Sequence, residues 1–108
     1  MTTERPLNEL TAEDFHAVQG ELFRLAVAQV NPQLNLELDL ELIEVTRLGG
    51  GLPGAGRAPF SVLFHGPLEP VLPQAIYGLE NERLGPLELF IVPIGPMAGA
   101  MRYEAVFG

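Results

Sequence analysis

The sequence is poor in the side chains that most often carry enzymatic chemistry. It has no cysteine, no lysine, a single serine, Ser61, and two histidines, His16 and His65. The lack of cysteine excludes disulfides, thiolate metal sites and cysteine nucleophiles. The lack of lysine excludes lysine catalysis and a phosphate-binding loop of the Walker type. Catalysis would have to rely on carboxylates or tyrosines, and no spacing singles any of them out, so we assign no catalytic residue, metal or cofactor.

Long hydrophobic runs are also absent, although 47% of the 108 residues are hydrophobic. No apolar run approaches the roughly 20 residues of a membrane-spanning helix, and Met1 to Leu10 has no apolar stretch of the signal-peptide type. We expect a cytoplasmic protein, with incorporation into an exported assembly as an open alternative. The length predicts a single β-rich domain over 1–108, with an N-terminal arm at 1–9, a helix at 11–19 and a sheet at 21–107.

Positive charge is scarce. The net charge of −8 arises from 14 acidic and six basic residues, and the basic residues are all arginines spread along the chain. A protein that binds nucleic acid needs clustered positive charge, so nucleic acid is a poor partner, and anionic membranes are poor partners for the same reason. The acidic excess favours solubility first and encounter with a basic partner second.

One short helix is predicted near the N-terminus. Thr11 to Asp14 approximates a capping box, with Asp in place of the preferred Glu or Gln. Phe15 and Val18 lie on one side of this helix, and Gly20 ends it.

After Gly20, hydrophobic residues recur at every second position, which is typical of half-buried strands. Strands are predicted at 21–30, 34–42, 60–65, 75–80, 87–92 and 101–107. In the second of these, five leucines from Leu34 to Leu42 share one face. The apolar phase then shifts to Ile43 and Val45, which predicts a β-bulge near Leu42 or Ile43.

Two segments are predicted to be exposed loops. Leu48 to Pro59 is rich in glycine, and Gly95 to Ala100 is predicted to be a second flexible loop after Pro93 interrupts its strand. Six strands without helices between them predict a mainly β fold, with about six antiparallel strands in a small barrel or sandwich and a short N-terminal helix over one end or edge.

Glycine and acidic patterns that suggest ligand sites have simpler interpretations. The segment 49–54 matches G-x-G-x-x-G, but Pro53 and Pro59 exclude the helix that a dinucleotide site requires. Glu37, Asp39 and Glu41 are interpreted as a solvated strand face, because residues two apart on a strand are about 6.5 to 7 Å apart.

The polar aromatic and hydroxyl residues also favour structural roles. Ser61 lies outside any nucleophile elbow, so a triad with His65 is disfavoured. Tyr77 and Tyr103 are interpreted as core aromatics whose hydroxyls reach a sheet edge or a backbone carbonyl. Arg102 and Glu104 are expected on the opposite face to Tyr103, in cross-strand pairs with neighbours such as Glu88.

Two sequence blocks carry a resemblance to a known family. Phe60-Ser-x-x-Phe-x-Gly-Pro67 and Tyr103-Glu-Ala-Val-Phe107, with further similarity over nearly the whole chain, resemble a small bacterial family known only as a domain of unknown function. The terminal Gly108, where Asn is expected, and a long 49–56 insertion depart from its pattern. The resemblance implies no catalytic residue. It implies genes encoded beside phage-tail-collar-like proteins, and hence a role in a tail-fibre-like surface assembly.

These observations favour a non-enzymatic protein-binding or assembly module that contacts its partner through the loops at 49–59 and 93–100. The candidate partner-binding residues are Gly49, Gly50, Gly51, Leu52, Gly54, Arg57, Met97 and Met101. An alternative is a small-molecule-binding barrel or enzyme that uses His65, Tyr77 and carboxylates at the barrel mouth. A third is self-association into a homo-oligomer through partly apolar outer faces at Leu63, Ile76, Phe90 and Val92.

Overall fold

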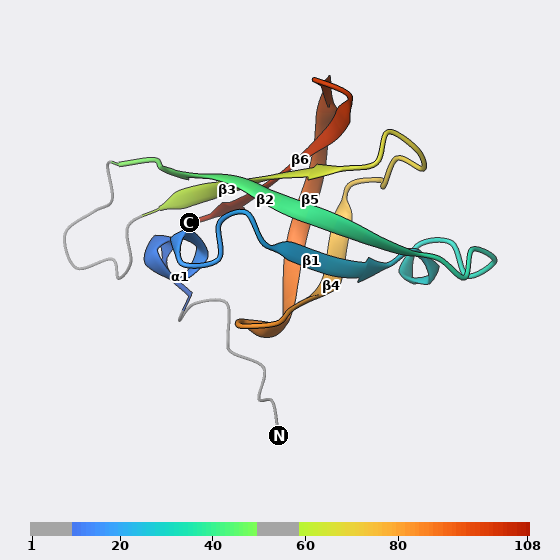
Figure 1. Ribbon diagram of the computed structural model, residues 1–108, viewed down its shortest axis with the longest axis horizontal. Helices are drawn as coiled ribbons and strands as arrows, with labels where there is room; N and C mark the ends of the chain where they lie inside the picture. The colour runs from blue at the N-terminus through green and yellow to red at the C-terminus, as the bar shows by residue number, and fades with distance from the viewer. Residues whose placement is uncertain (1–9, 50–58) are drawn as a thin grey trace.

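The computed structural model describes residues 10–49 and 59–108, and within them six antiparallel strands close into a barrel (Figure 1). The order around the barrel is β1-β2-β3-β6-β5-β4, and a short helix, α1, lies near the N-terminus. The elements are α1 (Ala12–His16), β1 (Leu22–Ala26), the 3₁₀ turn η2 (Val27–Gln29), β2 (Glu37–Arg47), β3 (Phe60–Gly66), β4 (Ala75–Asn81), β5 (Gly85–Met97) and β6 (Ala100–Phe107). The predicted fold class is confirmed as a barrel.

Two long strands hold the barrel together because each pairs with different neighbours along its length. The first half of β2 pairs with β1 and its second half pairs with β3, while β5 pairs first with β4 and then with β6. The register shifts between Leu42 and Glu44 on β2 and between Pro93 and Gly95 on β5. Bulges and bends of this kind let one strand pass between two sheets that face each other. The predicted bulge near Leu42 is confirmed.

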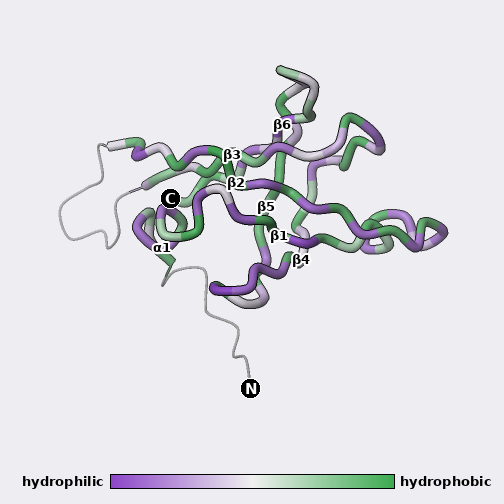
Figure 2. The backbone as a smooth tube through the Cα atoms, viewed as in Figure 1, coloured by the Kyte–Doolittle hydropathy of each residue, from purple (hydrophilic) through white to green (hydrophobic). Residues whose placement is uncertain are grey.

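The side chains that alternate toward the inside fill the barrel. Figure 2 shows hydrophobic and hydrophilic residues succeeding each other along the strands. The inward row of β6 is buried, as the sequence predicts, and so are the inward rows of β1, β3 and β4 apart from the partly buried Ala75. At one end Phe15 of α1 packs against Phe60 and Phe107, with ring centroids 5.8 and 5.2 Å away. The helix therefore closes this end of the barrel with an aromatic side chain.

The start of α1 follows the predicted capping box. The hydroxyl of Thr11 accepts a hydrogen bond from the backbone N–H of Asp14, and the Asp14 carboxylate accepts one from the Thr11 N–H at 2.8 Å. The α-helix is shorter than predicted and ends at His16, but Phe15 and Val18 are both buried as expected. An ion pair between Glu13 and Arg47 joins the helix to β2, and its hydrogen bond lowers the pKa of the Glu13 carboxyl.

The predicted bounds of the first two strands are wrong around the β1–β2 connection. β1 ends at Ala26, where η2 begins, and the backbone N–H of Val27 donates to the carbonyl of Leu36. Strand pairing therefore begins only at Ala26 and Glu37. Leu34 and Leu36 lie in the connection and are exposed, whereas the later leucines of the row are buried.

The predicted break at Pro93 and the flexible loop at 95–100 are also wrong. β5 runs through Pro93 to Met97, because the bulge absorbs the irregularity and the ladder resumes beyond it. Arg102 stabilises this bulge by donating hydrogen bonds to the carbonyls of Gly95 and Ile94, at 3.2 and 3.4 Å. The expected pairing of Arg102 with Glu88 does not occur, since Glu88 lies opposite Gly78 on the other side of β5.

Two glycines in strands offer a matched test of this packing, because neither has a left-handed backbone. A Cβ at Gly66 would lie 2.6 Å from Cδ2 of Leu40 and 3.3 Å from the ring of Tyr103, both in the core. We expect Gly66→Ala to lower the free energy of unfolding by about 1–3 kcal/mol in urea denaturation. A Cβ at Gly78 would meet only Oε1 of Gln29, at 3.5 Å. Gly78→Ala is expected to raise the free energy of unfolding by up to about 1 kcal/mol. Equal losses of stability in both variants would contradict this packing.

Candidate functional site

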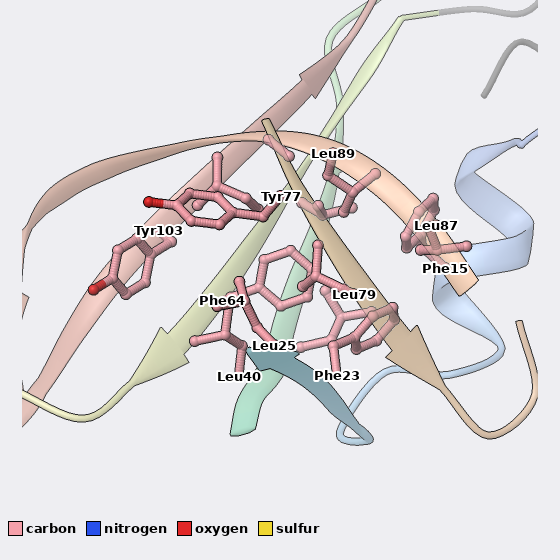
Figure 3. Close-up of a cluster of buried hydrophobic side chains, with 14 of the residues drawn as sticks. Phe15, Phe23, Leu25, Leu40, Phe64, Tyr77, Leu79, Leu87, Leu89 and Tyr103 are labelled. Atoms are coloured by element: carbon pink, nitrogen blue, oxygen red, sulfur yellow. The ribbon is translucent and has the colours of Figure 1, made fainter. Parts of the chain in front are cut away.

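The barrel interior is a packed core, and the polar groups of its two tyrosines are used for structure. Figure 3 shows the hydroxyls of Tyr77 and Tyr103 at the end of the cluster farther from α1. The hydroxyl of Tyr103 accepts a hydrogen bond from the backbone N–H of Leu72 at 2.9 Å, and the hydroxyl of Tyr77 donates to the carbonyl of Pro73. Both bonds anchor the β3–β4 connection, which confirms the interpretation of these residues as core aromatics.

The electrostatics of the tyrosines agree with this structural role. Burial raises the pKa of Tyr77, with a smaller contribution from the charge of Tyr103, and burial also raises the pKa of Tyr103. Both phenols therefore stay protonated near neutral pH, and neither can act as a general base there. Tyr77 is fully buried, so the arrangement at the barrel mouth that the sequence suggested for a small-molecule site does not form around it.

The β5–β6 hairpin is the most prominent feature outside the core. It projects away from the barrel (Figure 1), and Met97 pairs with Ala100 across a two-residue turn. Both turn residues have positive φ, 54° at Ala98 and 80° at Gly99, as a type I′ hairpin turn requires. Met97 is 57% exposed and Ile94 is also exposed, so the hairpin presents apolar side chains on an ordered scaffold.

The predicted partner-binding residues separate into four groups. Met97 lies at the exposed hairpin tip, whereas Met101 belongs to β6 and is only 8% exposed because it faces the core. The structure therefore removes Met101 from the exposed set. Gly49 follows β2 and has φ of 66°. The remaining five lie outside the described residues: Gly50, Gly51, Leu52, Gly54 and Arg57.

The seam between β1 and β4 is a second feature, which the sequence pattern does not indicate. Only two residue pairs join these strands, and hollows of about 470 to 610 Å³ lie along them on the outer wall. Arg24 and Glu80 line all three hollows, and neither His65 nor Tyr77 lines any of them. These three hollows thus lie on the barrel wall.

Side-chain amides close both ends of this short seam. The amide of Gln29 donates to the carbonyl of Gly78 at 3.0 Å and accepts from its N–H at 2.7 Å, which imitates a strand neighbour. Asn81, itself buried, donates to the carbonyl of Leu22 at 3.2 Å. Nothing in the sequence pattern marks these two amides, because their partners lie about 50 to 60 residues away in the chain.

The sequence candidates for catalysis or metal binding are dispersed in the structure. Ser61 and His65 are four residues apart on β3, which is about 13 Å along a strand, and Ser61 is buried. Glu37, Asp39 and Glu41 are exposed on β2, as expected of a solvated strand face. Over 10–49 and 59–108, no group of three or more His, Cys, Asp or Glu side chains is placed to hold a metal ion.

Comparison with protein families places the chain in one of them. Residues 10–107 match the family described as Domain of unknown function (DUF6916), which covers the helix and all six strands of the described structure. The chain belongs to this family. No curated protein and no solved structure matches it. The description of the family assigns no activity. In the part of the chain that the structure describes, no helix is long and apolar enough to cross a membrane.

The buried tyrosines generate a test at alkaline pH. Tyr103→Phe leaves the buried N–H of Leu72 without its acceptor, so we expect a loss of about 1–3 kcal/mol in the free energy of unfolding at pH 7. The raised pKa values mean that unfolded phenols ionise first as the pH rises above about 10, so the stability of the wild-type protein falls there.

The alkaline loss should be shallower in Tyr103→Phe, which has one titrating phenol fewer. The alkaline loss of stability can be assigned to the tyrosines, because the chain has two tyrosines and neither lysine nor cysteine, whose side chains would also titrate in this pH range. Urea denaturation at several pH values, with phenolate absorbance followed in parallel, measures both quantities. Stability that stays constant from pH 9 to 11 would show that the hydroxyls are not buried as described.

Proposed function

We propose that this protein is a non-enzymatic protein-binding module whose contact site is the tip of the β5–β6 hairpin. Met97 supports this proposal, because it is 57% exposed on a hairpin that projects from the barrel (Figure 1). Ile94 adds a second apolar side chain, exposed at the bulge of the same hairpin. An apolar tip presented in this way is typical of a surface that another protein covers.

The rigidity of the hairpin supports this proposal. The type I′ turn fixes its end, and the hydrogen bonds from Arg102 to the carbonyls of Ile94 and Gly95 hold its bulge. A preordered segment loses little conformational entropy on binding, which raises the affinity that a small contact can reach. Methionine suits such a tip because its flexible thioether adapts to the shape of the partner.

The dispersal of the candidate catalytic side chains among the described residues supports a binding role. Ser61 and His65 are about 13 Å apart along β3, and both tyrosine hydroxyls are engaged by the backbone of the β3–β4 connection. We further propose that the partner belongs to a phage-tail-fibre-like assembly of a bacterial cell. This partner rests on the sequence resemblance alone, whereas the proposal that the protein is made in the cytoplasm rests on the lack of long apolar runs in the sequence.

Site-specific photo-crosslinking tests the hairpin as the contact site. A photoreactive phenylalanine analogue at position 97, in the cell that naturally produces the protein, should give a covalent adduct with one other polypeptide. The same analogue at Val106, which is 60% exposed on the barrel body, is the matched control and should not. Mass spectrometry of the adduct identifies the partner.

The identified partner then permits an affinity measurement. Met97→Glu is expected to weaken binding about tenfold or more, because it places a charge in an apolar contact. Val106→Glu should change the affinity less than twofold. Adducts at position 106 but not at 97, or equal affinities for both variants, would contradict the hairpin as the binding site.

A further inference from the structure

The outer wall of the barrel carries a hollow that the proposed hairpin contact does not use. It has a volume of about 470 Å³ and spreads over β1, β4 and the first half of β5. Its floor is low because the outward position in the middle of β4 is Gly78, and Ala26 at the end of β1 also lines it. Gly78 lies opposite Glu88 of β5, and Gln29 closes the hollow on the other side. The hollow is therefore a product of two small residues within a face of larger ones.

Charge around this hollow is unbalanced. Three carboxylates line it, those of Glu37, Glu80 and Glu88, against the single guanidinium of Arg24. Arg24 lies 3.9 Å from Glu37 and 3.7 Å from Glu80, so the one cation is shared between two of the carboxylates. The Glu37 and Glu80 side chains are about two-thirds exposed, at 67% and 63%. The wall thus keeps an excess of two negative charges beside an uncharged glycine floor.

An exposed apolar pair continues the same face. Ile76 of β4 lies opposite Phe90 of β5, and their exposed fractions are 65% and 48%. Ile76 precedes Gly78 by two residues, so it lies about 6.5 to 7 Å along the strand on the same side of the sheet. The acidic hollow and the apolar surface of this face are therefore separated by the distance between alternate residues of an extended chain.

We propose that this face, which we define by Ile76, Gly78, Glu80, Glu88 and Phe90, docks an extended basic segment of a partner protein. A lysine or arginine of that segment enters the hollow above Gly78, and its aliphatic stem covers the side chain of Ile76. An apolar residue two positions along the segment packs on Ile76 and Phe90, because alternate residues of an extended chain point the same way.

Complementarity of charge and of apolar surface selects this occupant over others. A second copy of the chain carries the same net charge of −8 and is repelled. A small cation satisfies the carboxylates but leaves Ile76 and Phe90 in water. The docking face is separate from the hairpin tip, so this inference does not depend on the proposed function.

A pair of synthetic peptides tests the inference. The probe is a capped heptapeptide in which lysine, isoleucine and lysine alternate with threonine, and the control replaces both lysines with glutamate. With isotope-labelled protein at low ionic strength, the lysine peptide should shift the amide resonances of residues 75–80 and 87–90 in a saturable manner. The glutamate peptide should leave them unchanged.

Two charge variants separate docking from general attraction. Glu37→Gln/Glu80→Gln/Glu88→Gln removes the three carboxylates of the hollow, and binding of the lysine peptide should weaken at least fivefold. Glu41→Gln/Glu44→Gln/Glu104→Gln removes the same number of charges from β2 and β6 and should weaken it less than twofold. Gly78→Val, which fills the hollow, should also abolish binding, provided that its spectrum shows a folded barrel.

Three results would overturn the inference: no saturable shift at millimolar peptide, equal weakening in the two triple variants, or spermidine binding as tightly as the peptide. Sedimentation of the free protein adds a fourth, because a stable dimer that protects the docking face would show that a second copy occupies it.

Discussion

The structure depends on one constraint, which is that β2 and β5 must each change pairing partners along their length without losing the strand ladder. Strand periodicity allows only one residue in two to face inward, so a bent strand that passes between two sheets needs an extra residue at the bend. The shift at Leu42–Glu44 supplies it on β2, and the shift at Pro93–Gly95 supplies it on β5. These two bends bring β1 and β4 together, and the pairing of these two strands closes the barrel.

The first bend was predictable from sequence, and the second was not, for a physical reason. On β2 the bend changes the phase of a purely hydrophobic and acidic alternation, so the shift from Leu42 to Val45 is visible in the residues themselves. On β5 the bend falls among prolines and glycines, whose ordinary effect is to end a strand. The strand continues past the bulge, where the side chain of Arg102 donates hydrogen bonds to the carbonyls of Gly95 and Ile94. That contact joins residues seven and eight positions apart across a turn, and the hydrophobic periodicity of the sequence does not predict it.

The candidate sites show the same division. Alternation identified the core rows and the outward positions of Ile76 and Phe90, and the helical pattern identified Phe15 as buried. It could not show that Gly78 lies opposite Glu88, or that Gln29 takes the place of a strand neighbour, because both depend on strand order. Met97 was marked for exposure by its place in a glycine-rich and proline-rich segment. Its actual setting, at the end of a paired hairpin, gives it a fixed position that a loop would not.

A filled core limits where a barrel of this size can interact with other molecules. The inward rows of the six strands, with Phe15 at one end and the tyrosine-anchored connection as a further contact, leave the interior to side chains. Any specific recognition by the described residues must then use outward side chains, which on a strand are spaced about 6.5 to 7 Å apart. An extended partner chain has the same repeat, so a β-barrel wall can match it residue for residue. A seam as short as the one between β1 and β4 interrupts the wall at one place, and the small residues beside it give that place its depth.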